Sequence, residues 1–234
     1  MTPCPFEAVV FDLDGTLIDS APAVLSALNK TLSAMGLRAI TRAELPAMLG
    51  HGARATLERG LAATGSDTAP DAVDRAMEVY LEFYLADPAA DTIVYPGARD
   101  VLDALRRQDI RLGICTNKPS ATTRPTLDAL GLTPYFASVR CGDAEPHPKP
   151  DGRHLVAVLD DLGASVSRSV YVGDAKPDVD GARNAGMPVV IVDFGGQPGG
   201  VAGLRADAVI THFNALSEAF AGLTASQATV GDAP

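Results

Sequence analysis

Six short apolar runs, each ended by polar or turn-forming residues, constrain the fold of this 234-residue chain more than any other feature. They occupy residues 7–12, 110–116, 137–141, 169–174, 189–193 and 207–211. Helical patterns lie between most of them, for example over residues 96–108, where Val101, Leu102 and Leu105 recur on one helix face. Unbroken apolar strands that alternate with helices are typical of a parallel sheet covered on both faces. The sequence therefore predicts a doubly wound α/β fold.

Residues from about 19 to 94 break this alternation, because they contain helical patterns and no strand pattern. Ser20 precedes the first of these patterns and is expected to cap its helix. Thr41 and Glu44 have the spacing of a capping box, and Pro70 is expected to open a further helix. These features predict a separate helical unit between the first strand and the rest of the sheet.

We therefore expect two domains: a discontinuous, Rossmann-like parallel-sheet core of residues 1–18 and 94–234, and an inserted helical cap domain of residues 19–93. Loops after the strands of an open α/β sheet border its ligand site. The inserted domain is accordingly expected to cover that site, opening and closing about linkers near residues 17–20 and 92–96.

Composition and charge restrict the partners and the compartment. Acidic residues number 29 against 19 basic ones, and the formal net charge is −10, which argues against binding to nucleic acid or to an anionic membrane. No apolar segment approaches the length of a membrane span, and the N-terminus lacks the features of a signal peptide. Cys4, Cys115 and Cys141 are widely separated and are expected to be free thiols. These features predict a cytoplasmic protein, and they leave the choice between monomer and dimer open.

The first apolar run ends in two aspartates one residue apart. Residues 8–20 read AVVFDLDGTLIDS, so Asp12 and Asp14 follow a predicted strand at a spacing that lets both face one crevice. A turn alone is the simpler explanation, because aspartate and glycine are ordinary turn formers. Neighbouring like charges repel and are costly to bury, however, so this arrangement favours a functional site.

Later strand ends add polar side chains at the same edge of the predicted sheet. These are Thr116, Asn117 and Lys118 after one run, Asp174 and Asp178 after another, and Lys149 in the segment PHPKPD. Taken singly, Thr116 and Asn117 also fit a helix cap, and Lys149 also fits a solvated surface lysine. Together they bring hydroxyl, amide, ammonium and carboxylate groups to one place, which folding alone does not require.

This set of groups suits the chemistry of phosphate esters. Asp12, Asp174 and Asp178 repel one another unless a cation holds them, and hard oxygen ligands are those that Mg²⁺ prefers. A magnesium ion, a lysine and backbone N–H donors can together neutralise a phosphoryl group. One aspartate can then attack phosphorus, while a second carboxylic acid protonates the leaving oxygen.

DLDGT, the strand-end Thr116, Lys149 and the stretch from Gly173 to Asp178 together resemble the four motifs of the haloacid-dehalogenase-like phosphohydrolase superfamily, in order and over nearly the whole chain. The resemblance implies that Asp12 is the nucleophile and a magnesium ligand. It implies further that Asp14 is the general acid and base and offers its backbone carbonyl to the metal.

In the same way, the resemblance implies that Thr116 and Lys149, with Asn117 beside them, hold the phosphoryl oxygens, and that Asp174 ligates the metal with the support of Asp178. Ala175 stands where serine or threonine is common, which removes no ligand. Dehalogenase members lack an acid two residues after the nucleophile, so Asp14 indicates a phosphatase.

Four stretches also look like bacterial phosphoglycolate phosphatases: FDLDGTLIDSAPAV, LGHGARATLERGL, YPGARDVLDALRRQ and RCGDAEPHPKPD. This resemblance makes 2-phosphoglycolate the expected substrate among small phosphate esters. Within the helical insertion, His51 or Arg54 in the sequence GHGAR is a candidate for meeting a substrate carboxylate. A glycine-rich helix junction with a solvated Arg54 explains the same residues equally well. A sugar-phosphate phosphatase, a phosphomutase and a non-catalytic binding protein remain the alternatives.

Overall fold

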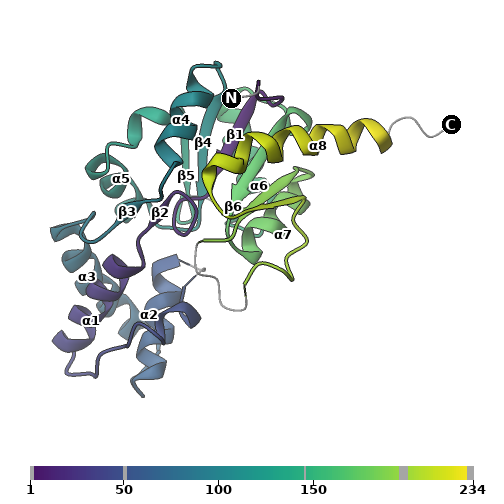
Figure 1. The fold of residues 1–234 in the computed structure, drawn as a ribbon. Helices are drawn as coiled ribbons and strands as arrows, with labels where there is room; N and C mark the ends of the chain where they lie inside the picture. The colour runs from purple at the N-terminus through teal and green to yellow at the C-terminus, as the bar shows by residue number, and fades with distance from the viewer. Residues whose placement is uncertain (1–2, 50–51, 145, 195–199, 231–234) are drawn as a thin grey trace.

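The computed structural model describes residues 3–49, 52–144, 146–194 and 200–230. A six-stranded parallel sheet in the order β5-β4-β1-β6-β7-β8 forms its centre (Figure 1). The strands are β1 (Ala8–Phe11), β4 (Arg111–Thr116), β5 (Ser138–Cys141), β6 (Ser169–Gly173), β7 (Val189–Val192) and β8 (Ala208–Ile210). Each lies within one of the six apolar runs, so these strand predictions are confirmed.

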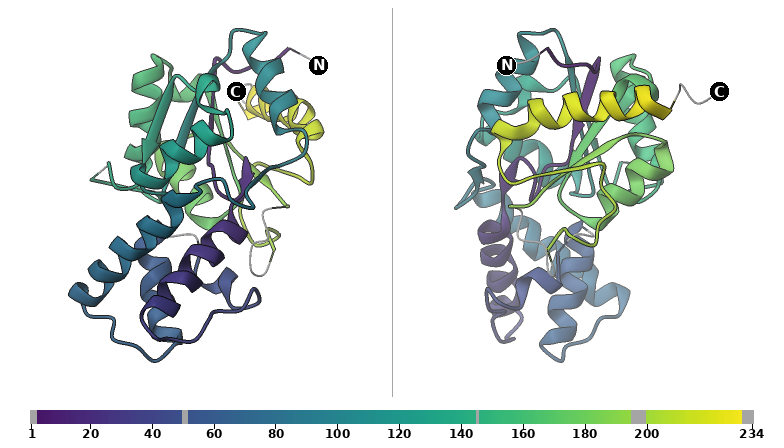
Figure 2. Two further views of the ribbon diagram at one scale, coloured as in Figure 1. Left: turned by 90° about the vertical axis from the view of Figure 1, so that its left-hand side faces the viewer. Right: turned by 45° about the vertical axis from the view of Figure 1, so that its right-hand side comes forward.

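Helices cover both faces of this sheet (Figure 2). The helices of one face are α4 (Ala98–Arg106), α5 (Ser120–Ala129) and α8 (Leu216–Val230), and those of the other are α6 (Gly152–Leu162) and α7 (Lys176–Ala185). In β1, Val9 and Phe11 join the first hydrophobic cluster, whereas Ala8 and Val10 join the second. The predicted doubly wound α/β fold is therefore confirmed.

Three helices lie outside the sheet, below it in Figure 1: α1 (Ala21–Ala34), α2 (Gly52–Ala63) and α3 (Pro70–Ala86). We call them the helical block. They bury a third hydrophobic cluster of their own, which includes Leu28, Leu57 and Tyr80. Pro70 begins α3 as predicted. The capping box is confirmed too, since the backbone N–H of Thr41 donates to Glu44 and that of Glu44 donates to Thr41, before a short 3₁₀ turn at Leu45–Ala47.

Two very short strands join the helical block to the sheet. β2 (Ile18–Asp19) and β3 (Ile93–Val94) pair antiparallel, with Ile18 opposite Val94. The sequence did not predict them, because two residues are too few to show a periodicity. Both chain crossings between sheet and helical block therefore run side by side.

No disulfide joins Cys4, Cys115 and Cys141, as predicted. Every helix in the described part of the chain is too short or too polar to cross a lipid bilayer.

Candidate active site

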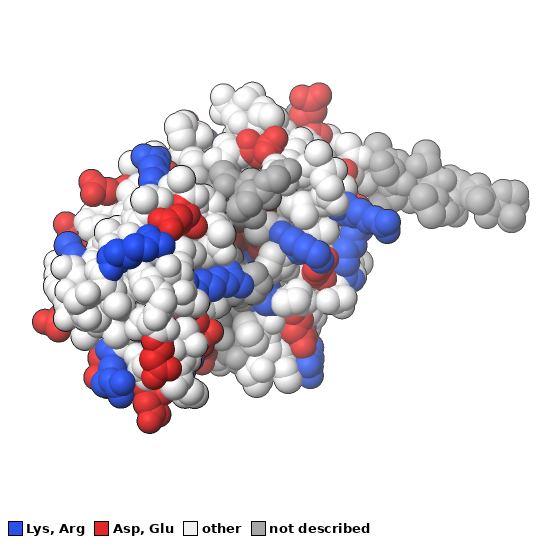
Figure 3. All heavy atoms as spheres, turned by 90° about the horizontal axis from the view of Figure 1, so that it is seen from below, with Lys and Arg blue, Asp and Glu red and all other residues white. Residues whose placement is uncertain are grey.

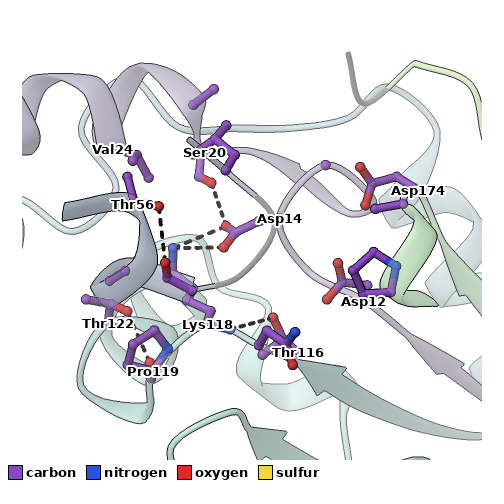
Figure 4. A pocket seen from close by; sticks show the side chains of 18 of the residues that line it. Asp12, Asp14, Ser20, Val24, Thr56, Thr116, Lys118, Pro119, Thr122 and Asp174 are labelled. Atoms are coloured by element: carbon purple, nitrogen blue, oxygen red, sulfur yellow. Dashed lines mark hydrogen bonds and ion pairs between the residues drawn. The ribbon is translucent and has the colours of Figure 1, made fainter. Parts of the chain in front are cut away.

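A pocket lies where the carboxyl ends of the central strands meet the helical block (Figure 4). Seven of the nine predicted site residues line it: Asp12, Asp14, Thr116, Asn117, Lys149, Asp174 and Asp178. The helical block adds Val24, Thr56 and Tyr80 to the wall. Strand ends far apart in the sequence thus converge as the parallel topology predicts.

The loop after β1 is held in a tight turn that presents both aspartates. The Asp12 N–H donates to Val172 O at 2.9 Å, which extends the sheet pairing by one residue. Gly15 has a φ of +84°, and a Cβ there would lie 2.5 Å from an oxygen of Asp174. Only glycine fits, because both the backbone angle and the close approach exclude a side chain.

Three buried carboxylates form one group on the wall of the pocket. Asp12, Asp174 and Asp178 each offer an oxygen within 4.8 Å of the others, and their exposed fractions are 7%, 3% and 1%. Burial, reinforced by the charge of Asp178 and opposed by Lys149, raises the pKa of Asp12 from 3.8 to about 6. Such a group of oxygen ligands fits a hard divalent cation such as Mg²⁺.

The oxygens of Asp178 are used differently from those of the other two carboxylates. One accepts from the backbone N–H groups of Asp174 and Ala175, at 3.1 and 2.9 Å. The other lies 2.6 Å from Lys149 Nζ and accepts the Tyr171 hydroxyl at 2.9 Å. Asp178 therefore fixes its neighbours, and Asp12 and Asp174 are the better placed to hold a metal.

Lys149 joins the carboxylates from a neighbouring loop. Its Nζ lies 2.8 Å from Asp12 and 2.6 Å from Asp178, and it donates to the Tyr171 hydroxyl at 2.8 Å. Burial by itself disfavours the charged amine, but the charges of Asp12 and Asp178 outweigh it and hold the pKa of Lys149 above its usual range. Lys149 is thus a buried ammonium and not the solvated surface lysine of the alternative reading.

Asp14 points away from that group, toward the helical block (Figure 4). The Ser20 hydroxyl donates to its Oδ1 at 2.5 Å, and Lys118 Nζ lies 3.2 Å from each of its oxygens. Ser20 is the N-cap residue of α1, as predicted, but its hydroxyl makes no capping hydrogen bond and donates to Asp14 instead. The Asp14 side chain is 36% exposed, against 10% for Asp12.

Lys118 is a pocket residue that sequence reasoning did not assign. Its side chain is 5% exposed, and its Nζ lies 4.9 Å from the centre of the Tyr84 ring, on α3. The sequence did hold a signal for Lys118. It lies two residues after Thr116, and in an extended chain this spacing directs both side chains to the same side.

Thr116 and Asn117 are not helix caps, because α5 begins only at Ser120. Thr116 Oγ1 accepts the Lys118 N–H at 3.2 Å, and Asn117 donates from its side-chain amide to Lys149 O at 3.0 Å. The second contact ties the β4 loop to the loop that carries Lys149.

Of the two residues predicted from the helical insertion, the structure tests only Arg54, because His51 lies outside the described residues. Arg54 is 48% exposed, pairs with Asp74 at 2.5 Å and Glu58 at 3.4 Å, and is not among the residues that line the pocket. Gly52, at the start of α2, packs closely against the loop after β4, since a Cβ there would lie 2.8 Å from Asn117 O.

The chain resembles known proteins in sequence and in fold. The family model described as haloacid dehalogenase-like hydrolase matches residues 9–192. A phosphoglycolate phosphatase of Agrobacterium fabrum is 39% identical over 210 residues, which cover 90% of each chain. One from Rhodospirillum rubrum is 42% identical over 216 residues, covering 91% of this chain and 90% of the relative.

Solved structures with a similar fold cover nearly the whole chain. A protein described as a predicted phosphoglycolate phosphatase from Haemophilus somnus superimposes with a TM-score of 0.85 at 24% identity, over 92% of this chain and 97% of that one. CbbY from Rhodobacter sphaeroides, in complex with phosphate, has a TM-score of 0.79 at 25% identity, over 90% and 96%.

Proposed function

Because the chain belongs to the haloacid dehalogenase-like hydrolase family and is a phosphoric monoester hydrolase, we propose that it is a Mg²⁺-dependent phosphatase that hydrolyses 2-phosphoglycolate to glycolate and phosphate. The names of its relatives support the substrate. The observation that carries the mechanism is the contrast between Asp12, buried against Lys149 among carboxylates, and Asp14, which is more exposed and turned toward the helical block.

In this proposal Asp12 and Asp174 hold Mg²⁺, with the backbone carbonyl of Asp14, and Asp178 fixes Asp174 and Lys149. The ion, when bound, supplies positive charge to the phosphoryl oxygens and to the carboxylates that face them. Lys149, Thr116 and Asn117 complete the cradle for the phosphoryl group.

The first chemical step transfers the phosphoryl group to the protein. An oxygen of Asp12 attacks phosphorus in line with the ester oxygen, the bond from phosphorus to that oxygen breaks, and its electron pair stays on the leaving glycolate. Asp14, as the carboxylic acid, gives its proton to this oxygen. The products are free glycolate and an aspartyl phosphate at Asp12.

The second step returns the protein to its starting state. Asp14, now a carboxylate, takes a proton from water, and the water oxygen attacks phosphorus. The bond between phosphorus and Asp12 breaks, which releases inorganic phosphate, the free Asp12 carboxylate and a protonated Asp14.

We also propose that the helical block, within the domain of residues 19–93, is a cap that excludes bulk water during the first step. Its support is the separate hydrophobic cluster of α1 to α3, together with the paired crossings at β2 and β3. The core would then comprise residues 1–18 and 94–234.

A screen of phosphate release tests the function. It compares 2-phosphoglycolate with ribose 5-phosphate, glucose 6-phosphate and pyrophosphate, each with Mg²⁺ and with a chelator. We expect kcat/KM to be highest for 2-phosphoglycolate and turnover to vanish on chelation. A sugar phosphate as the best substrate would replace the substrate assignment, and full activity in the chelator would contradict the metal dependence.

A further inference from the structure

We propose that the Lys118 ammonium binds a carboxylate carried on the carbon next to the ester oxygen of the substrate, and so determines specificity. The inference rests on the proposed function and deepens it. It defines the substrate class as phosphate monoesters of 2-hydroxy carboxylates.

Lys118 is a buried cation on the pocket wall. It follows β4, lines the same pocket as the carboxylates, and reaches the face of the Tyr84 ring on α3. Its Nζ lies 3.2 Å from both Asp14 oxygens and 4.9 Å from the centre of that ring, so a carboxylate and an aromatic face both stabilise its positive charge (Figure 4).

The position of Asp14 fixes how far this charge is from the reaction. Lys118 Nζ is 3.2 Å from both Asp14 oxygens. An ester oxygen that takes a proton from Asp14 must lie at hydrogen-bond distance from one of them, and is therefore within about 6 Å of Lys118 Nζ. A carboxylate on the adjacent carbon places its oxygens roughly 3 Å from the ester oxygen, so a carboxylate turned toward Lys118 reaches contact with that ammonium.

The charges in the pocket favour the same partner. Among the described residues of the pocket wall, the side-chain cations are Lys118, which pairs with one carboxylate, Asp14, and Lys149, which pairs with two, Asp12 and Asp178. A phosphorylated hydroxy acid brings several negative charges to a protein of net charge −10. On the face in Figure 3, basic side chains lie among acidic ones, so the attraction has to be local.

This assignment differs from the one made on sequence alone. Arg54 was a candidate for the carboxylate, but its guanidinium is paired with Asp74 and Glu58 away from the pocket wall. Lys118 lies beside the proposed acid and needs no rearrangement of the helical block to reach the substrate.

Paired substrates and a charge-removing variant test the inference. Lys118→Met keeps most of the side-chain length and removes the ammonium, and 2-hydroxyethyl phosphate replaces the carboxylate of 2-phosphoglycolate by a neutral group. We expect the variant to lower kcat/KM for 2-phosphoglycolate about 10- to 100-fold more than for 2-hydroxyethyl phosphate, mostly through KM, because a charge-assisted contact is lost with one ester alone. Lys118→Arg should retain most of the preference.

Binding without turnover gives an independent measurement. Calorimetry with the unreactive 3-phosphonopropionate should show the same selective weakening in Lys118→Met, whereas propylphosphonate should bind wild type and variant alike. Lys30→Met, on the exposed surface of α1, is the matched control and should change neither.

Equal losses with both esters, or unchanged binding of 3-phosphonopropionate, would overturn the inference and leave Lys118 as a partner of Asp14 only. The proposed function fails by a different result, namely wild-type protein that releases phosphate from other esters faster than from 2-phosphoglycolate. The Lys118 result is a ratio between two matched esters, so the two failures are distinguishable.

Discussion

Asp12 and Asp14 are two residues apart and have different surroundings. Asp12 is buried beside Lys149 and two further carboxylates, whereas Asp14 is more exposed and contacts Ser20 and Lys118. Environments that differ in this way let two identical side chains perform nucleophilic and acid–base roles. The division of labour thus comes from neighbours supplied by other strands.

Magnesium binding should weaken as the pH falls through 6. Since the pKa of Asp12 is raised from 3.8 to about 6, this carboxyl gains a proton that competes with the metal at a pH where an ordinary aspartate stays charged. One competing proton makes the apparent affinity about tenfold lower at pH 5 than at pH 7.5. Calorimetric titration with Mg²⁺ at both values measures this, and equal affinities would contradict the environment described for Asp12.

Tyr171→Phe should lower kcat about tenfold and leave KM nearly unchanged. The buried hydroxyl accepts from Lys149 at 2.8 Å and lies 2.9 Å from an oxygen of Asp178, so its loss leaves both groups less firmly held. Steady-state kinetics check this against Tyr135→Phe, because Tyr135 packs against the first hydrophobic cluster, whereas Tyr171 belongs to the second. Equal kinetics for both variants would show that the hydroxyl does not matter.

At the level of elements, the sequence predicted those that have a strong periodic signal. The six apolar strands, the helix from Pro70 and the capping box at Thr41 needed only local patterns. The sequence predicted Ser20 as a helix cap but not the hydrogen bond from its hydroxyl to Asp14, because the partner of a hydroxyl depends on packing. Lys118 was given no role for the same reason, since its burial against Tyr84 of α3 depends on tertiary packing.

The contact between α2 and the loop after β4 gives a prediction at this scale. Gly52 has a φ of +83° and a Cβ there would meet Asn117 O at 2.8 Å, so Gly52→Ala should push the helical block from the sheet and lower kcat/KM at least about tenfold. Gly65→Ala is the matched control, because its φ is +74° but nothing lies within 4 Å. Kinetics alike in both variants would show that this contact has no part in turnover.

On the scale of the whole molecule, a sheet with two covered faces carries a helical block with its own hydrophobic cluster. The two are joined by the paired two-residue strands β2 and β3. In the proposed function, the helical block closes over the site about this connection.

Ligand binding should therefore slow amide exchange at the seam between the two parts. With Mg²⁺ and 3-phosphonopropionate, we expect slower hydrogen exchange in residues 15–20, 92–96 and the first turn of α2, because closure shields these amides. Exchange that slows only in the loops of the sheet would argue against closure.

The substitution Asp12→Asn tests the central claim most directly. It removes the attacking oxygen anion and keeps nearly the same shape, so phosphate release from the best substrate at saturating Mg²⁺ should fall at least about a thousandfold while the fold and the melting temperature are retained. Phosphate release within about tenfold of the wild-type rate by a folded Asp12→Asn protein would contradict nucleophilic attack by this residue.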